Sequence, residues 1–192
     1  MTNRGTLTNK GHLYLPSYGT IDTTNGTFAN YGTKTGSGHI IGSYTDHGVT
    51  KPGNSAGAMT IDGNYFKRGG SIEIELGGLL DGGGDKSATQ FDWIDVTGNV
   101  ELAGTLDVQL IGEFIPQPDD SFNVLRVGGT LTGQYDGLDE GSLVGNFSGE
   151  DLFITYAGGD GNDVTLFTVP EPTTVLIWSM LAGLGLAARR RQ

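Results

Sequence analysis

A seven-residue motif recurs near the start of the chain. Residues 5–11 read GTLTNKG and residues 26–32 read GTFANYG, so the same small, apolar and Asn positions return after 21 residues. This spacing is typical of one turn of a β-solenoid, in which each unit buries its apolar face only by stacking on its neighbours. Looser echoes begin at Gly104 and Gly129. The repeat predicts an all-β chain wound as a parallel β-helix, or solenoid.

Local patterns support short strands joined by tight turns. Apolar and polar residues alternate in residues 71–76 (SIEIEL) and 105–110 (TLDVQL), the period of a half-buried strand. The chain has 34 glycines among 192 residues, which disfavours helices and suits turns. No stretch before Val175 has a sustained helical period, so we expect essentially no helix in the body, residues 1–168. A β-sandwich-like fold, or a solenoid with a β-sandwich cap, remains the alternative architecture.

The charge of the chain excludes several classes of function. The formal net charge is −11, and an acidic surface repels phosphate backbones, so nucleic acid is not expected as a partner. The absence of cysteine excludes disulfides, thiol catalysis and thiolate metal sites. The body must therefore be stabilised by packing and backbone hydrogen bonds.

The last residues, 169–192, differ sharply from the body. Residues 175–188 carry no charge and are followed by Arg189, Arg190 and Arg191. With Thr173 and Thr174, the apolar run predicts a transmembrane helix over residues 173–188, although it is short for a bilayer. The positive-inside rule places the arginines in the cytoplasm and the body across the membrane. The alternative is a buried C-terminal helix.

The order of features in this tail resembles the PEP-CTERM sorting signal. Pro170, Glu171 and Pro172 precede the apolar segment, and the arginine cluster follows it. The resemblance implies recognition by an exosortase-type membrane protease, transient anchoring in the inner membrane, and delivery to the cell surface or extracellular matrix. The sorting residues would be Pro170, Glu171, Pro172, Arg189, Arg190 and Arg191. The chain opens MTNRGTLTNKGHLYL, without the apolar core of a signal peptide, which predicts a truncated or misplaced start.

Two runs in the body look like the autotransporter-associated β-strand repeat of bacterial surface proteins. They are residues 52–65, and residues 91–98 followed by 102–106. The resemblance implies a parallel β-helix like that of a secreted passenger domain. It also leaves open that the chain is a fragment of a larger adhesin.

One motif could suggest a serine hydrolase. Residues 53–57 (GNSAG) match the GxSxG nucleophile elbow, which requires a strand-to-helix turn and a histidine later in the chain. Here a strand-like segment follows, and His12, His39 and His47 all lie upstream. We interpret the motif as a turn between strands. The histidines lack a convincing metal-ligand spacing, so we interpret them as structural or solvent-facing.

A second motif could suggest calcium. Residues 158–163 (GGDGND) match the start of the GGxGxDxUx calcium repeat, but only one copy is present and Thr165 replaces an apolar residue. A Gly/Asp turn before a final strand is the preferred interpretation. Weak Ca²⁺ binding remains possible, and no other cofactor is expected.

Several acidic and aromatic residues could serve carbohydrate chemistry. Paired carboxylates could hydrolyse a glycosidic bond, but close carboxylates are also expected by chance in an acidic chain, where they form a solvated face. Exposed tyrosines could stack on sugar rings, or could instead fill the corners of coils. The acidic pairs are Asp92 with Asp95, Asp119 with Asp120, and Asp136 with Asp139, and the tyrosines are Tyr14, Tyr18, Tyr31 and Tyr44.

The sequence thus predicts an exported, non-enzymatic surface or matrix protein with a structural or adhesive role, such as in a biofilm. The exosortase is the partner expected for the tail, and extracellular polysaccharide is the candidate ligand for the body. The alternative function is a β-helical enzyme that binds or cleaves polysaccharide.

Overall fold

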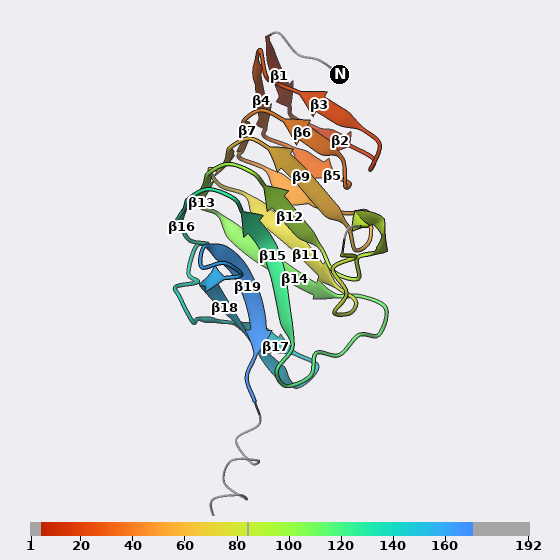
Figure 1. Cartoon of the computed structure of the whole chain (residues 1–192), viewed down its shortest axis with the longest axis vertical. Helices are drawn as coiled ribbons and strands as arrows, with labels where there is room; N and C mark the ends of the chain where they lie inside the picture. The colour runs from red at the N-terminus through yellow and green to blue at the C-terminus, as the bar shows by residue number, and fades with distance from the viewer. Residues whose placement is uncertain (1–4, 84, 171–192) are drawn as a thin grey trace, which may run out of the picture.

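The computed structural model describes residues 5–83 and 85–170, which wind as a parallel β-helix (Figure 1). Each of the first five coils contributes one strand to each of three sheets. The first sheet contains β1 (Thr6–Asn9), β4 (Thr27–Asn30), β7 (Tyr44–Asp46), β10 (Tyr65–Lys67), β13 (Val100–Leu102) and β16 (Leu131–Gly133), in that order.

The second sheet has five parallel strands and the third has eight strands. The second contains β2 (His12–Tyr14), β5 (Thr33–Thr35), β8 (Val49–Lys51), β11 (Ser71–Leu76) and β14 (Thr105–Leu110). The third contains β3 (Thr20–Asp22), β6 (His39–Ile41), β9 (Ala58–Asp62), β12 (Trp93–Val96) and β15 (Ser121–Val127), followed by the antiparallel β19 (Asp163–Thr168), β18 (Glu150–Gly158) and β17 (Leu143–Phe147).

The 21-residue repeat is confirmed as one turn of the solenoid. Strands β1 and β4 pair in parallel, with Leu7 opposite Phe28 and Asn9 opposite Asn30. The repeat is not uniform, because Phe28 pairs with Tyr44 only 16 residues later. The echoes at Gly104 and Gly129 do not stack on each other, since Thr105 begins β14 of the second sheet and Leu131 begins β16 of the first.

A column of glycines explains part of the glycine content. Gly11, Gly32, Gly48, Gly70 and Gly104 lie between the first and second sheets in successive coils. A Cβ atom on any of the last four would overlap the carbonyl oxygen of the glycine in the preceding coil. The turn therefore requires glycine, because successive backbones approach too closely for any side chain.

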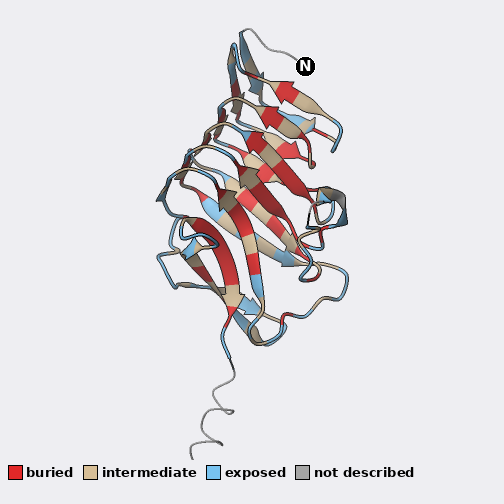
Figure 2. Ribbon diagram, viewed as in Figure 1, coloured by how far each residue is buried: buried red, intermediate tan, exposed pale blue. Residues whose placement is uncertain are grey.

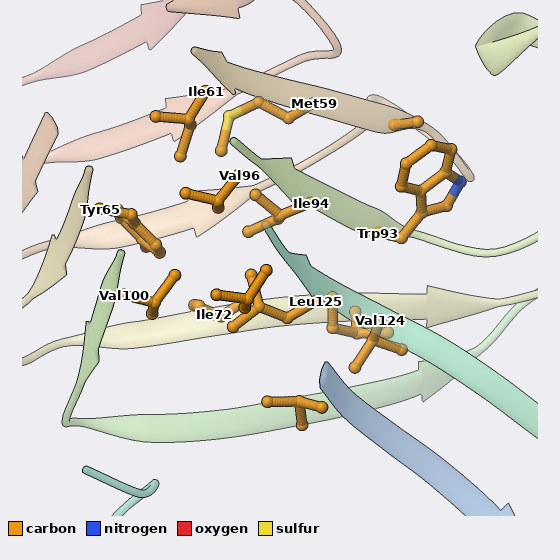
Figure 3. Close-up of a cluster of buried hydrophobic side chains, with 14 of the residues drawn as sticks. Met59, Ile61, Tyr65, Ile72, Trp93, Ile94, Val96, Val100, Val124 and Leu125 are labelled. Carbon is orange, nitrogen blue, oxygen red and sulfur yellow. The ribbon is translucent and has the colours of Figure 1, made fainter. Parts of the chain in front are cut away.

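The apolar core fills the space between the sheets (Figures 2 and 3). Along β11, the burial alternates as the sequence predicts, with Ile72, Ile74 and Leu76 buried. The rings of Phe28, Tyr44 and Tyr65 stack along the axis, with centroids 4.9 and 5.3 Å apart. Parallel in-register strands place equivalent side chains about 4.8 Å apart, so like residues stack into continuous columns.

One interior column is polar rather than apolar. Asn9, Asn30, Asp46 and Lys67 occupy equivalent positions in β1, β4, β7 and β10. The carboxylate of Asp46 accepts hydrogen bonds from Asn30 Nδ2 (2.7 Å) and Lys67 Nζ (2.6 Å). The Lys67 ammonium also donates to the carbonyl oxygens of Gly48 and Ser71. All three of its N–H groups therefore have acceptors, which makes this buried ion pair tolerable.

The C-terminal end of the solenoid is covered by antiparallel strands. The hairpins β17 to β19 continue the third sheet, and Phe147 and Tyr156 pack against the core. This cap extends an existing sheet instead of forming a β-sandwich, so the sandwich alternatives are wrong. The described chain contains no α-helix and only one 3₁₀ turn, Lys86–Ala88.

The predicted transmembrane helix, residues 173–188, lies outside the described residues. Among the residues that are described, no helix is long and apolar enough to cross a membrane. The last described residue, Pro170, follows β19 at the end of the molecule opposite the N-terminal coils (Figure 1).

Candidate carbohydrate-binding groove

A groove of about 360 Å³ lies on the outer face of the second sheet. All five strands of this sheet contribute to it, together with the turn that follows β8. Because successive coils stack in register, the lining side chains form rows along the solenoid axis. The lining residues are His12, Thr33, Thr35, Lys51, Gly53, Asn54, Glu73, Ile74, Glu75, Asp92 and Gln109.

Strand alternation turns the polar residues of the second sheet outward. In β11, Glu73 and Glu75 face the groove while the neighbouring Ile72 and Leu76 are buried in the core. The Glu73 carboxylate pairs with Lys51 of the preceding coil. The His12 ring nitrogen Nε2 lies 2.9 Å from the Thr35 hydroxyl. These contacts hold charged and polar groups in fixed positions across four coils.

Asp92 closes one end of the groove and is almost fully buried. Its two carboxylate oxygens accept hydrogen bonds from the backbone N–H groups of Gly57 (2.7 Å) and Glu75 (3.0 Å). Burial raises the pKa of Asp92 to about 8, against the lowering effect of these two hydrogen bonds. The carboxyl group therefore binds the turn after β8 to the end of β11.

A second titratable group lies in the interior. Lys34 projects inward from β5, and its Nζ contacts the Gly36 carbonyl oxygen and the Met59 sulfur. Burial lowers the pKa of Lys34 to about 7, and the negative charges of Asp46 and Asp92 only partly oppose this effect. Unlike Lys67, Lys34 has no carboxylate as a hydrogen-bond partner among the residues that the structure describes.

The rim of the groove is lined by groups that form hydrogen bonds. Its rim offers the exposed amides of Asn54 and Gln109 and the charged groups of Lys51 and Glu75. These groups donate and accept hydrogen bonds in the way that sugar hydroxyls require. Tyr14, in the same outward row as Thr35 and Lys51, is 53% exposed and can stack on a sugar ring. In the described part of the chain, no cluster of residues could hold a metal ion.

Of the acidic pairs singled out from the sequence, Asp92 and Asp95 do not share a site. Asp92 is buried beside the groove, whereas Asp95 forms an ion pair with Lys86 on the third sheet. Asp120 accepts a hydrogen bond from the backbone of Gln117 in a loop. Asp136 and Asp139 are exposed in the segment between β16 and β17.

The GxSxG segment connects two strands, as expected. It links β8 to β9, with Ser55 exposed and Gly53 lining the groove. The histidines are spread over the molecule: His12 lines the groove, His39 begins β6 of the third sheet, and His47 follows β7. The Nε2 atom of His39 is buried without a hydrogen-bond partner in the described structure.

The GGDGND segment is the turn of the hairpin between β18 and β19. Asp163 is buried, and its carboxylate accepts hydrogen bonds from Asn123 Nδ2 (2.6 Å) and the Val127 N–H (2.8 Å). Asn162 donates to the carbonyl oxygens of Val127 and Gly129. These side chains therefore attach the cap to the last parallel coil. The segment is a turn before the final strand, as the sequence predicts.

The tyrosines divide into two groups. Tyr14, Tyr18 and Tyr31 are 53%, 89% and 55% exposed, which suits a role in surface contacts. The prediction that Tyr44 could be an exposed aromatic is wrong, because its ring is fully buried between Phe28 and Tyr65. Its position in β7 repeats the inward position of Phe28 in β4.

Of the residues that line the groove, Glu73, Glu75, Gln109 and Lys51 are not marked by any sequence motif. Glu73 and Glu75 read only as the polar side of a strand, and Gln109 lies 34 positions after Glu75 in the sequence, although the two pair in the sheet. Aligning the two alternating segments SIEIEL and TLDVQL would have brought them together. No sequence pattern of this kind indicates that Lys51 pairs with Glu73.

Comparison with known proteins identifies the tail. Residues 168–192 match the PEP-CTERM protein-sorting motif, beginning one residue before the predicted boundary. Pro170 is exposed, and Glu171, Pro172 and the three arginines lie outside the described residues. No curated protein and no solved structure matches the chain significantly, and the resemblance of the body to autotransporter repeats is not confirmed. The chain therefore ends in a PEP-CTERM sorting signal, which marks it for processing by an exosortase, a membrane protein, and for export to the cell envelope or surface.

Proposed function

We propose that this protein is an exported, non-catalytic component of the cell surface or extracellular matrix that binds polysaccharide in the groove of the second sheet. The observation that carries the proposal is the groove itself, in which five coils present amide, amine, imidazole and carboxylate groups on one face. A ligand that extends along the solenoid axis meets a polar side chain at each coil. Polysaccharides are extended and carry hydroxyl groups on every sugar.

The position of the sorting motif fits a protein that is attached to the cell envelope. The motif begins at residue 168, where β19 ends, and the N-terminal coils lie at the other end of the molecule (Figure 1). A body held to the envelope through its C-terminal end would direct its N-terminal coils away from the point of attachment. Biofilm or matrix cohesion is the role that such an arrangement serves.

Binding is tested with the full chain and a panel of neutral and acidic polysaccharides, by glycan array and calorimetry. The double substitution Asn54→Ala/Gln109→Ala removes two exposed amides from the groove, and we expect binding to weaken about tenfold. Gln134→Ala, which removes an exposed amide outside the groove, is the matched control. If the wild-type chain binds none of the polysaccharides, the proposal is refuted.

Cleavage of polysaccharide is the second candidate. The raised pKa of Asp92, beside Glu75, resembles the acid and carboxylate pair of a glycoside hydrolase. We favour binding because Asp92 is only 2% exposed and both of its oxygens already accept backbone hydrogen bonds. Release of reducing ends or unsaturated products by the wild type, but not by Asp92→Asn, would establish cleavage instead.

Sorting is tested separately in a bacterium that has an exosortase. With a secretion signal supplied, deletion of residues 168–192 should prevent delivery to the surface, and the unmodified chain should reach it. Equal delivery of both would contradict the assignment of the tail.

A further inference from the structure

The first coil leaves one end of the solenoid open. In the part of the chain that the structure describes, β1, β2 and β3 are the terminal strands of the three sheets, and each pairs with a strand on one side only. The other edge of each strand faces along the solenoid axis, away from the molecule (Figure 1). The backbone groups at such an edge form a template for a further β-strand.

The apolar interior also reaches the surface at this open end. A hollow of about 310 Å³ is lined mainly by Leu7, Leu13, Leu15, Ile21 and Phe28. Leu7 and Leu13 are only half-buried, whereas Phe28, which occupies the position of Leu7 in the next coil, is 1% exposed. Covering the open end would therefore bury apolar surface as well as pair strand edges.

The opposite end of the solenoid is closed. Strands β17 to β19 cover it, and Phe147 and Tyr156 pack against the core. The Tyr156 hydroxyl also fixes the segment after β16, because it accepts a hydrogen bond from the Tyr135 N–H and donates one to the Leu138 carbonyl oxygen. Stacking of one copy on the interior of another is therefore restricted to the two open ends.

The first coil carries little charge, although the chain is acidic. Residues 5–25 contain one lysine, Lys10, and one carboxylate, Asp22, whereas the whole chain has a net charge of −11. Strand β1 reads TLTN and has none of the charged or proline residues that protect edge strands from pairing. Two copies can therefore approach through their first coils without the repulsion that their acidic later coils would cause.

We propose that two copies of this chain associate head to head through their first coils. The contact has a two-fold axis perpendicular to the solenoid axis, which makes the facing edge strands antiparallel. The longest of the three strands, β1, pairs with β1 of the second copy, and the apolar side chains of the two open ends cover each other. Because the same surface is used on both copies, the contact is closed and ends at a dimer.

This contact connects two points of attachment. Pro170 lies at the end opposite the first coil (Figure 1), so the C-terminal ends of a head-to-head pair point in opposite directions. The sorting motif begins at residue 168 in each copy. A pair formed between neighbouring cells therefore joins their surfaces, and it does so without a polysaccharide in the groove.

The first test measures association of the full chain by sedimentation velocity over a concentration series, in a detergent that disperses the apolar tail. Thr6→Lys/Thr8→Lys adds two like charges to exposed positions of β1, and we expect it to weaken dimerisation about tenfold. Thr130→Lys/Thr132→Lys is the matched control. These threonines are also exposed, and they lie at β16, the other terminal strand of the same sheet, so the control should dimerise like the wild type.

A single introduced cysteine tests the geometry of the contact. The chain has no cysteine of its own, so Thr8→Cys carries the only thiol, and a short bismaleimide should join two copies through β1. Thr132→Cys, at the closed end, should not be joined. Because these variants add no charge, they test the contact even if urea denaturation shows that the lysine variant is unfolded.

Three results would overturn head-to-head association. The first is a wild-type chain that stays monomeric over the whole concentration series. The second is equal dimerisation by the two lysine variants. The third is cross-linking of Thr132→Cys as efficient as that of Thr8→Cys, which would indicate association through another surface or through the tail. Polysaccharide binding in the groove needs no dimer, so each of these results leaves the proposed function intact.

Discussion

The two buried lysines of the solenoid should respond in opposite ways to replacement by methionine. Lys34 has a folded-state pKa of about 7, against an ordinary value of 10.5, because its burial is not offset by a hydrogen-bonded carboxylate. The folded state therefore has no penalty from Lys34 above pH 10.5, and the penalty grows as pH falls to about 7. Below that pH the penalty is constant, because lysine is charged in both states.

The magnitude follows from the size of this shift. The difference between a pKa of about 7 in the folded state and 10.5 in the unfolded state corresponds to roughly 5 kcal/mol. Lys34→Met recovers this energy but leaves the Gly36 carbonyl without its donor, which costs about 1 kcal/mol. We expect the variant to be more stable than the wild type by up to about 4 kcal/mol at pH 6, with the advantage disappearing near pH 10.

Urea denaturation at pH 6, 8 and 10 measures this difference, with Lys67→Met as the comparison. Lys67→Met leaves the buried Asp46 carboxylate unpaired, so it should destabilise the protein by about 3–5 kcal/mol. If Lys34→Met destabilises the protein equally at every pH, the amine is not held in an unfavourable environment, and the reasoning is wrong.

Other substitutions test the backbone, the core and the buried carboxyl. Gly48→Ala should destabilise the fold by more than 2 kcal/mol in urea titrations, because its Cβ would overlap the Gly32 carbonyl oxygen, whereas Gly11→Ala meets no atom within 4 Å and should change little. Ile72→Ala should cost about 2–5 kcal/mol by the same measurement, since Ile72 is 1% exposed. Because burial raises the pKa of Asp92, the contribution of this carboxyl to the free energy of unfolding should be fully present below pH 3.8 and lost as the pH rises to about 8. In urea titrations at several pH values, Asp92→Asn should not show this loss.

The sequence by itself determined the class of fold and the sorting of the chain. The 21-residue repeat predicted the pairing of β1 with β4 residue by residue, because in a solenoid the repeat length is the strand-pairing register. The alternation in SIEIEL likewise predicted which side of β11 is buried. The order of prolines, apolar segment and arginines predicted the PEP-CTERM motif, which is read as a linear sequence and needs no fold.

The tertiary structure alone decided which residues share a surface. Coil lengths vary, with 16 residues from Phe28 to Tyr44 and 35 from Asn64 to Asn99, so sequence spacing does not predict which later residues stack. Tyr44 became a core residue because the shorter coil placed it above Phe28. The groove depends on the same stacking, since its side chains come from coils whose separation only the folded chain defines.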